Sequence, residues 1–277
     1  MILRSQRRTV LAAVLVPLLL LVAFGAAAYT ALSRDLEPPA MSSAAVPGWL
    51  TLPAPGTPWV LLLNLTASIA VLVVSAVLAN LGIRNLYVRT GAAEILFIML
   101  FFTSLSLEGL RFGNLVALER GLSAGLALLL SRVVLFGRLF GLMCLLVSSL
   151  YAAGMKYNHH PVLIGGMLVL AFTAAGILPL DGTLLEATLM HRLGDRRGYL
   201  FVTGLLAILA VIDFLIAARI RRSRRFLALA GSCVCLILGR ELALMGIAPL
   251  PTVLGAGLLS GGLVLFARNI GIFYLGV

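Results

Sequence analysis

The dominant feature of this sequence is a series of eight apolar stretches, each long enough to cross a lipid bilayer as a helix. A transmembrane helix needs roughly 20 largely apolar residues. Stretches of this kind lie at about 10–31, 58–82, 93–116, 123–151, 161–180, 199–218, 226–248 and 252–275. Their Leu, Ala and Gly content suits helices better than the alternating strands of a barrel. The sequence therefore predicts an all-α, polytopic membrane helical bundle with eight transmembrane helices.

The composition excludes a soluble domain. Hydrophobic residues make up 61% of the 277 positions and charged residues only 11%, whereas a soluble domain is about half apolar and about a quarter charged. The formal net charge of +11 would indicate nucleic-acid binding in a soluble protein. In a membrane protein, the same charge has to be placed relative to the bilayer before it indicates a partner.

The segments outside the expected spans alternate in charge. The N-terminal segment and the second, fourth and sixth connections hold eleven basic residues and no acid, whereas the other connections hold five basic and six acidic residues. The positive-inside rule then predicts a bacterial inner (plasma) membrane protein with both termini in the cytoplasm, and no nucleic-acid partner. One cytoplasmic group could contact membrane lipid headgroups or an acidic partner protein: Arg219, Arg221, Arg222, Arg224 and Arg225.

The first apolar stretch has two interpretations. Arg7 and Arg8, followed by an apolar run and the small residues at 25–28, are typical of a cleaved secretory signal, and cleavage would leave seven helices. The uninterrupted apolar length favours a retained anchor helix instead. We therefore divide the chain into an N-terminal anchor at 1–31, a Pro-rich external connection at 32–57 and a seven-helix transmembrane bundle at 58–277.

Nine ionisable side chains lie within the expected spans, where each marks either a functional site or an internal ion pair. Counting along each span at about 1.5 Å per residue sorts eight of them into two layers. The outer layer comprises Glu108, Glu241, Arg111 and Arg240, and the inner layer comprises Glu94, Asp213, Arg138 and Arg268. Each layer is neutral, so we expect ion pairs between helices within each layer.

Arg132 is the ninth charge and has no obvious partner at its depth. A guanidinium in the membrane core needs a carboxylate, backbone carbonyls, water or an anionic ligand. We therefore take Arg132 as the first candidate for substrate contact, with Arg138, Arg268 and Asn269 beside it. The alternative is that the fourth span shifts and Arg132 pairs with Glu108.

Small residues predict close contacts between helices. Three pairs of glycines stand four residues apart, the spacing that allows helix backbones to approach closely: Gly121 and Gly125, Gly137 and Gly141, and Gly257 and Gly261.

Patterns for catalysis and metal binding are weak. His159 and His160 lie on the opposite side of the predicted membrane from His191, so no metal site is expected, and no motif indicates a cofactor. On the outer side, His191 and Asp195 stand beside arginines, as an enzyme acting on a phosphorylated or lipid-linked substrate would require. The same group is also typical of an interfacial turn that meets lipid phosphates.

These observations leave three hypotheses for the function. The first is a non-enzymatic permease or membrane subunit that binds or moves a small anionic or amphiphilic solute. The second is a sensor or scaffold subunit that acts through a cytoplasmic protein partner. The third is an outer-surface enzyme that uses His191 and Asp195.

Overall fold

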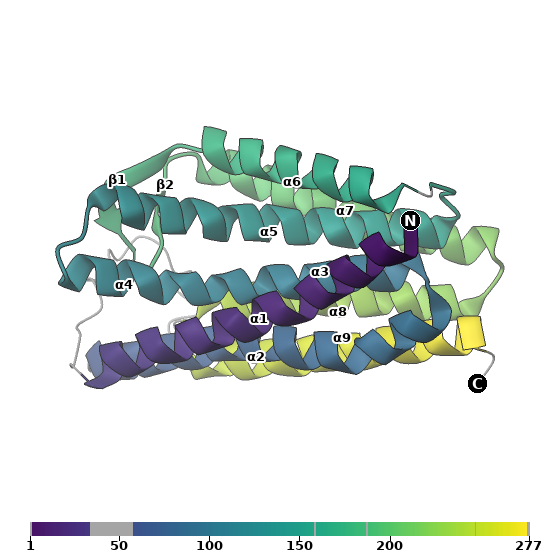
Figure 1. Cartoon of the computed structure of the whole chain (residues 1–277), viewed down its shortest axis with the longest axis horizontal. Coiled ribbons are helices and arrows are strands. Elements are labelled where there is room, and N and C mark those ends of the chain that lie inside the picture. The colour runs from purple at the N-terminus through teal and green to yellow at the C-terminus, as the bar shows by residue number, and fades with distance from the viewer. Residues whose placement is uncertain (1, 34–57, 158, 187, 247, 276–277) are drawn as a thin grey trace.

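The protein is a bundle of long helices whose axes run close to one common direction (Figure 1). The computed structural model describes residues 2–33, 58–157, 159–186, 188–246 and 248–275. Within them, eight helical segments are long and apolar enough to cross a membrane: Arg8–Ser33, Trp59–Thr90, Ala93–Glu119, Ala124–Ala153, His160–Ile177, Arg196–Ile220, Arg224–Met245 and Pro249–Leu275. The all-α class and the eight expected spans are confirmed. Most of the Pro-rich connection, residues 34–57, lies outside the described residues.

The elements follow one another with short connections. They are α1 (Ile2–Ser33), α2 (Pro58–Thr90), α3 (Ala93–Leu105), the 3-10 helix η2 (Ser106–Leu110), α4 (Arg111–Glu119), α5 (Ala124–Ala153), α6 (His160–Ile177), β1 (Leu180–Leu185), β2 (His191–Leu193), α7 (Arg196–Ile220), α8 (Arg224–Met245) and α9 (Pro249–Leu275). The start of α1, the end of α9 and the turn between α7 and α8 share one end of the bundle, which we call the arginine-rich end (Figure 1). The strands lie at the opposite end, which we call the hairpin end.

The third span is not one continuous helix. The sequence predicts a single helix over 93–116, but η2 interrupts it between α3 and α4. A Cβ added at Gly109 would lie 3.2 Å from the Cβ of Phe24 and 3.3 Å from Cγ2 of Val73, so α1 and α2 approach this turn closely. A 3-10 segment inside a helix often marks a functional position. Here the segment carries Glu108 into the interior.

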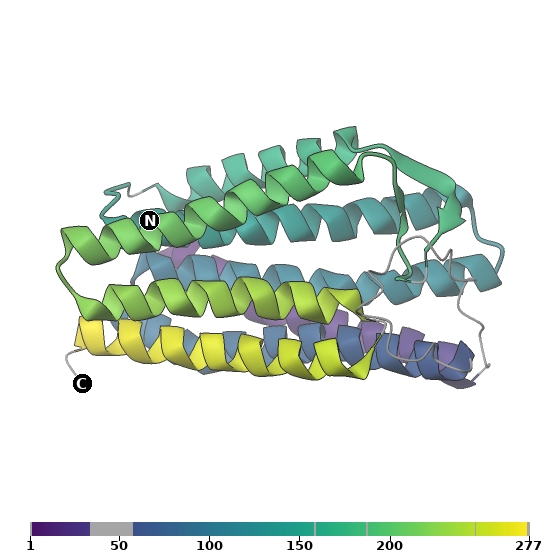
Figure 2. The same cartoon turned by 180° about the vertical axis from the view of Figure 1, so that it is seen from behind.

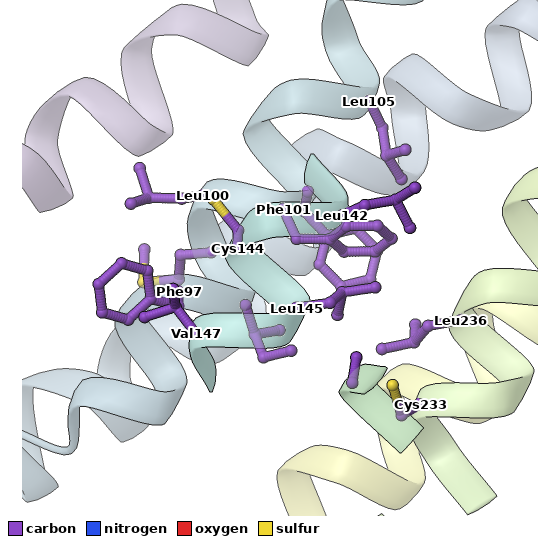
Figure 3. Packing of buried hydrophobic residues seen from close by; sticks show 14 of the residues in the cluster. Phe97, Leu100, Phe101, Leu105, Leu142, Cys144, Leu145, Val147, Cys233 and Leu236 are labelled. Atoms are coloured by element: carbon purple, nitrogen blue, oxygen red, sulfur yellow. The ribbon is translucent and has the colours of Figure 1, made fainter. Parts of the chain in front are cut away.

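The core is built around α3, of which eleven of thirteen residues are buried. Phe97 of α3 stacks on Tyr151 of α5 with ring centroids 5.6 Å apart. Figure 3 shows Phe101 packed near Leu142 of α5, with Leu236 of α8 beyond them. Because lipid is as apolar as these side chains, dense packing rather than exclusion from water holds the helices together.

One of the three predicted glycine pairs lies at a helix contact. A Cβ at Gly137 of α5 would lie 2.7 Å from Cδ1 of Leu107, and a Cβ at Gly141 would meet the hydroxyl of Ser104. The absence of side chains at these two positions therefore lets α5 approach α3 and η2.

The other two predicted pairs face open space: Gly121, Gly125, Gly257 and Gly261. The close contact between α8 and α9 uses different glycines. A Cβ at Gly239 would lie 2.9 Å from the carbonyl oxygen of Gly255, and a Cβ at Gly255 would lie 2.8 Å from that of Gly239. Four-residue spacing within one helix does not reveal this contact, because the two glycines come from different helices.

The connection between α6 and α7 folds into an antiparallel hairpin that the sequence analysis did not predict. Strands β1 and β2 pair Leu180 with Leu193 and Asp181 with Arg192. The turn of the hairpin enters the bundle, because Leu189 is fully buried in a cluster that includes Phe24 of α1 and Phe112 of α4. The hairpin turn therefore packs between the helices at the hairpin end of the bundle.

Candidate functional site: a buried cluster of arginines and glutamates

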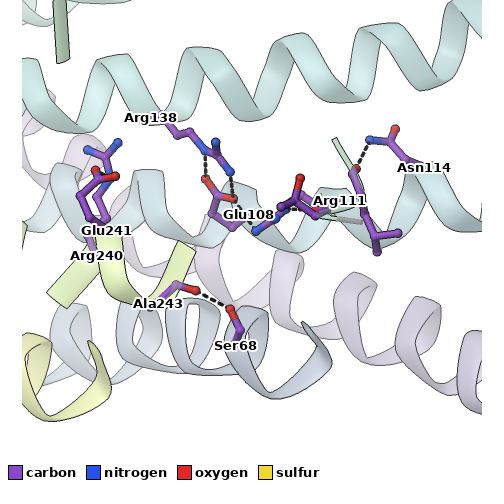
Figure 4. Close-up of polar contacts among 10 residues, drawn as sticks. Ser68, Glu108, Arg111, Asn114, Arg138, Arg240, Glu241 and Ala243 are labelled. Atoms are coloured by element: carbon purple, nitrogen blue, oxygen red, sulfur yellow. Dashed lines mark hydrogen bonds and ion pairs between the residues drawn. The ribbon is translucent and has the colours of Figure 1, made fainter. Parts of the chain in front are cut away.

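Glu108 is the centre of the buried charges. Its carboxylate accepts two hydrogen bonds from Arg138, from Nε to Oε1 at 2.7 Å and from Nη2 to Oε2 at 2.9 Å (Figure 4). Nη1 of Arg111 lies 3.4 Å from Oε2 of the same carboxylate. A bidentate arginine–carboxylate pair is among the strongest polar contacts in proteins. One buried carboxylate is thus shared between two arginines.

The position of Arg138 differs from the prediction. Its distance from the expected outer end of its span predicts a place in the inner layer. Since α5 has 30 residues, it is longer than the roughly 20 needed to cross the bilayer, and its first turns extend past the hydrocarbon. Counted from the arginine-rich end, Arg138 and Glu108 each lie about 22 Å along their helices. Counting from that end would have paired them correctly.

Arg240 lies at nearly the same depth, about 24 Å from the start of α8. Its side chain is only 1% exposed, and its Nε lies 3.4 Å from Oε1 of Glu241, an ion pair without hydrogen-bond geometry. Nη1 and Nη2 have no hydrogen-bond partner among the described residues. Glu241 itself is about half exposed. The Arg240 guanidinium is therefore a buried cation with unused donors.

These five residues form one electrostatic unit, which we call the Glu108 cluster: Glu108, Arg111, Arg138, Arg240 and Glu241. The charge of Arg240 acts on the Glu108 carboxylate, and the charge of Glu241 acts on Arg138. Figure 4 shows Arg240 and Glu241 on the side of Glu108 opposite to Arg111. With all groups ionised, three arginines face two carboxylates, so the cluster has a net charge of +1.

Arg132, the first candidate from sequence, does not belong to this cluster. Its side chain is exposed, and Glu108 is paired with Arg138 and Arg111 instead. Counted from Ala153, Arg132 lies about 32 Å along α5, at the far edge of a hydrocarbon core about 30 Å thick. A guanidinium at that depth can reach the interface, so it needs no buried partner.

Two other residues proposed for substrate contact also face outward. Arg268 of α9 is exposed, and Asn269 donates a hydrogen bond to the carbonyl of Leu265 in its own helix at 2.7 Å. The structure therefore brings together Arg138 and Arg240, but neither Arg268 nor Asn269, at the Glu108 cluster.

The expected inner layer of ion pairs is not formed among the described residues. Glu94 accepts a hydrogen bond from the hydroxyl of Tyr274 at 2.8 Å, which links α3 to α9. Asp213 of α7 accepts one from the hydroxyl of Ser149 at 3.4 Å. Hydroxyl groups rather than arginines are therefore the partners of these two acids.

A polar network connects the cluster to the hairpin. Nε of Arg111 donates to the carbonyl of Thr188 at 2.8 Å, and the amide of Asn114 donates to the carbonyl of Leu189 at 2.8 Å. Sequence reasoning missed this network because its acceptors are backbone carbonyls, which no side-chain pattern reveals. The one available signal was the presence of two polar residues, Arg111 and Asn114, within an apolar span, because such residues need polar partners.

His191 and Asp195 do not form a catalytic pair. The Nδ1 of His191 is hydrogen-bonded to the hydroxyl of Ser131 at 2.9 Å, and the amide of Asn114 donates to the same hydroxyl at 3.0 Å. Asp195 instead accepts from the backbone N–H of Gly198 at 2.9 Å and caps α7. A serine hydrogen-bonded to a histidine can also act as a catalytic nucleophile, because the histidine can serve as its general base. Ser131, however, is fully buried, and its contacts hold the hairpin to α4 and α5.

The eight spans and the buried charges between them define a multi-pass helical membrane protein. Comparison with known protein families, with characterised proteins and with solved structures finds no match for this chain. Among the described residues, no three His, Cys, Asp or Glu side chains lie together in a group that could hold a metal ion.

Proposed function

We propose that this protein is a non-enzymatic permease or membrane subunit of a bacterial inner membrane that binds a small anionic or amphiphilic solute at the Glu108 cluster. Both termini would lie in the cytoplasm, as the charges of the connections indicate. The observation that carries the proposal is Arg240, whose side chain is 1% exposed and whose Nη1 and Nη2 have no hydrogen-bond partner among the described residues.

Physical chemistry favours an anion at this position. A guanidinium has five N–H donors and stays ionised, and a buried charge is costly unless it is paired and hydrogen-bonded. A carboxylate or phosphate group could accept two parallel hydrogen bonds from Nη1 and Nη2 of Arg240. It would also offset the net charge of +1 in the Glu108 cluster. An apolar tail on the solute would be compatible with the surrounding membrane.

Two side chains of the cluster reach the surface of the bundle. Glu241 is about half exposed, and the Arg138 side chain is 15% exposed. A solute would therefore reach Arg240 past Glu241, while Arg138 stays paired with Glu108.

A thermal unfolding titration of the purified full chain tests the proposal. Phosphate, acetate and octanoate would be added separately at constant ionic strength. A ligand that binds only the folded state at 100 times its dissociation constant stabilises the protein by about 2.7 kcal/mol. We expect at least one of these anions to raise the unfolding temperature of the native protein, and Arg240→Gln to abolish that increase.

Arg268→Gln is the matched control, because it removes an arginine from another span where the side chain is exposed. This variant should respond to the anion as the native protein does. The proposal is wrong if Arg240→Gln retains the full response, or if both variants lose it equally. It is also wrong if none of the three anions changes the unfolding temperature of the native protein.

A further inference from the structure

A second candidate binding surface lies between α7 and α8 at the arginine-rich end, away from the Glu108 cluster. A groove of about 610 Å³ is lined by apolar residues of both helices and by three arginines of the turn: Ile212, Leu215, Ile216, Ala218, Arg219, Arg222, Ser223, Arg224 and Leu227. Figure 2 shows α7 and α8 side by side at this turn and diverging toward the hairpin end. The groove therefore combines an apolar floor with a cationic rim.

The apolar part continues along the helices. A second groove of about 240 Å³, farther from the turn, is lined by residues such as Val211 of α7 and Val234 of α8. Ile212 lines both grooves, so they adjoin. All seven side chains that line the second groove are apolar. A ligand that fits both grooves needs an anionic end at the arginines and a hydrocarbon chain that runs toward the membrane centre.

The five arginines of this turn differ in their contacts. The guanidinium of Arg221 lies 4.9 Å from the ring centre of Phe226 and 5.1 Å from that of Phe273. Nη1 of Arg225 donates to the carbonyl of Ile272 at 3.2 Å. Arg221 and Arg225 thus hold α8 against α9, whereas Arg219, Arg222 and Arg224 line the groove.

We propose that the groove between α7 and α8 binds an anionic phospholipid, with its phosphate at Arg219, Arg222 and Arg224 and an acyl chain along Ile212 and Val211. Charge complementarity and the continuous apolar floor carry this inference, which does not depend on the solute proposed for the Glu108 cluster. A free phosphate would use only the rim, and an acidic protein would leave the apolar floor unfilled.

Native mass spectrometry of the full chain in mild detergent tests this site with phosphatidylglycerol and phosphatidylcholine as probes. The variant Arg219→Gln/Arg222→Gln is compared with Arg221→Gln/Arg225→Gln, which removes the same charge from the same turn. A hydrogen bond to a charged group contributes about 1.5 kcal/mol or more, so losing the contacts of two arginines to the phosphate should weaken phosphatidylglycerol binding at least about tenfold. The control variant should change this affinity less than about threefold, by the same affinity scale.

A second pair of variants tests the apolar floor. Ile216→Trp places a bulky ring in the groove, whereas Ile220→Trp places it on an exposed position of the same helix outside the groove. Only Ile216→Trp should reduce lipid retention.

Several results would overturn the lipid site. Equal losses in the two arginine variants would indicate diffuse attraction to the turn, and equal binding of phosphatidylcholine would remove the role of charge. Displacement of the lipid by inorganic phosphate would identify a site for the phosphate group alone. Displacement by a stoichiometric soluble protein would identify a protein interface.

Discussion

Arg138 and Arg240 lie at nearly the same depth in the bundle, but their surroundings differ. Arg138 of α5 donates two hydrogen bonds to Glu108 at 2.7 and 2.9 Å. Arg240 of α8 is more deeply buried, yet it has only a long ion pair with a half-exposed carboxylate. The first arginine is a structural group that links α5 to η2. The second has buried donors without a hydrogen-bond partner among the described residues, which is why we propose it as a binding group.

The comparison shows that burial alone does not tell whether the surrounding protein satisfies an intramembrane charge. In the sequence, both arginines lie within expected spans, where a charged side chain is costly. The difference is whether the surrounding protein satisfies the guanidinium. Four predictions test this difference and the contacts around it, beginning with the largest expected effect.

Glu108→Gln should cause the largest loss of stability. The substitution leaves Arg138 and Arg111 buried without a carboxylate, and breaking a buried ion pair in this way costs about 3–5 kcal/mol. The free energy of unfolding in mixed micelles with a denaturing detergent measures the loss. Glu241→Gln is the control, and because that carboxylate is about half exposed and its ion pair with Arg240 is long, at 3.4 Å, it should cost less than Glu108→Gln. Equal losses would mean that Glu108 is not the centre of the cluster.

Replacing each arginine by methionine should show that Arg138 contributes to stability and that Arg240 does not. Arg138→Met removes two charge-assisted hydrogen bonds and should destabilise the protein by about 1.5–3 kcal/mol, because Arg111 remains as a partner of Glu108. Arg240→Met replaces an unsatisfied buried cation by an apolar chain, so stability should stay within about 1 kcal/mol or increase. The same unfolding assay compares the two. A larger loss of stability for Arg240→Met than for Arg138→Met would show that Arg240 is a structural group.

Asn114→Ala should loosen the hairpin without unfolding the bundle. Its amide donates to Leu189 and Ser131, and two such hydrogen bonds contribute about 1–2 kcal/mol. Hydrogen exchange at the backbone amides of 188–193 should become faster. Asn269→Ala removes an amide that bonds only within its own helix, and it should leave this exchange unchanged.

The smallest expected effect is a dependence of stability on pH through His191, which lies outside the spans. Burial lowers the pKa of His191, and the charge of Asp181 opposes this only in part. The folded state therefore binds fewer protons than the unfolded state, whose histidine has a pKa of about 6.5. Stability should be unaffected above that pH and should fall as the pH decreases from about 6.5 toward the lower pKa of the folded state.

Thermal unfolding between pH 7.5 and 5 measures this effect. His191→Asn should reduce the pH dependence, whereas the same change at the exposed His159 should not. An unchanged slope in His191→Asn would assign the effect to another group.

Much of the architecture could be predicted from sequence, because apolar length alone determines where a helix can cross a membrane. The charge pairing was not predicted, because depths measured from opposite ends of helices with unequal lengths are not comparable. That error placed Arg138 in the wrong layer and Arg132 in the interior. The hairpin was missed because β1 and β2 are short and have no clear alternation. The sequence identifies Arg240 as an intramembrane charge, but whether its donors find hydrogen-bond partners among the described residues depends on tertiary packing.

The break at η2 also bears on how the chain assembles during synthesis. Glu108 leaves the ribosome together with Arg111, and α5 then delivers Arg138 before α7 and α8 exist. The only deeply buried carboxylate of the Glu108 cluster is therefore already engaged when Arg240 arrives with the penultimate helix. Within the cluster, the arginine that is synthesised last is therefore the one whose Nη1 and Nη2 have no hydrogen-bond partner among the described residues.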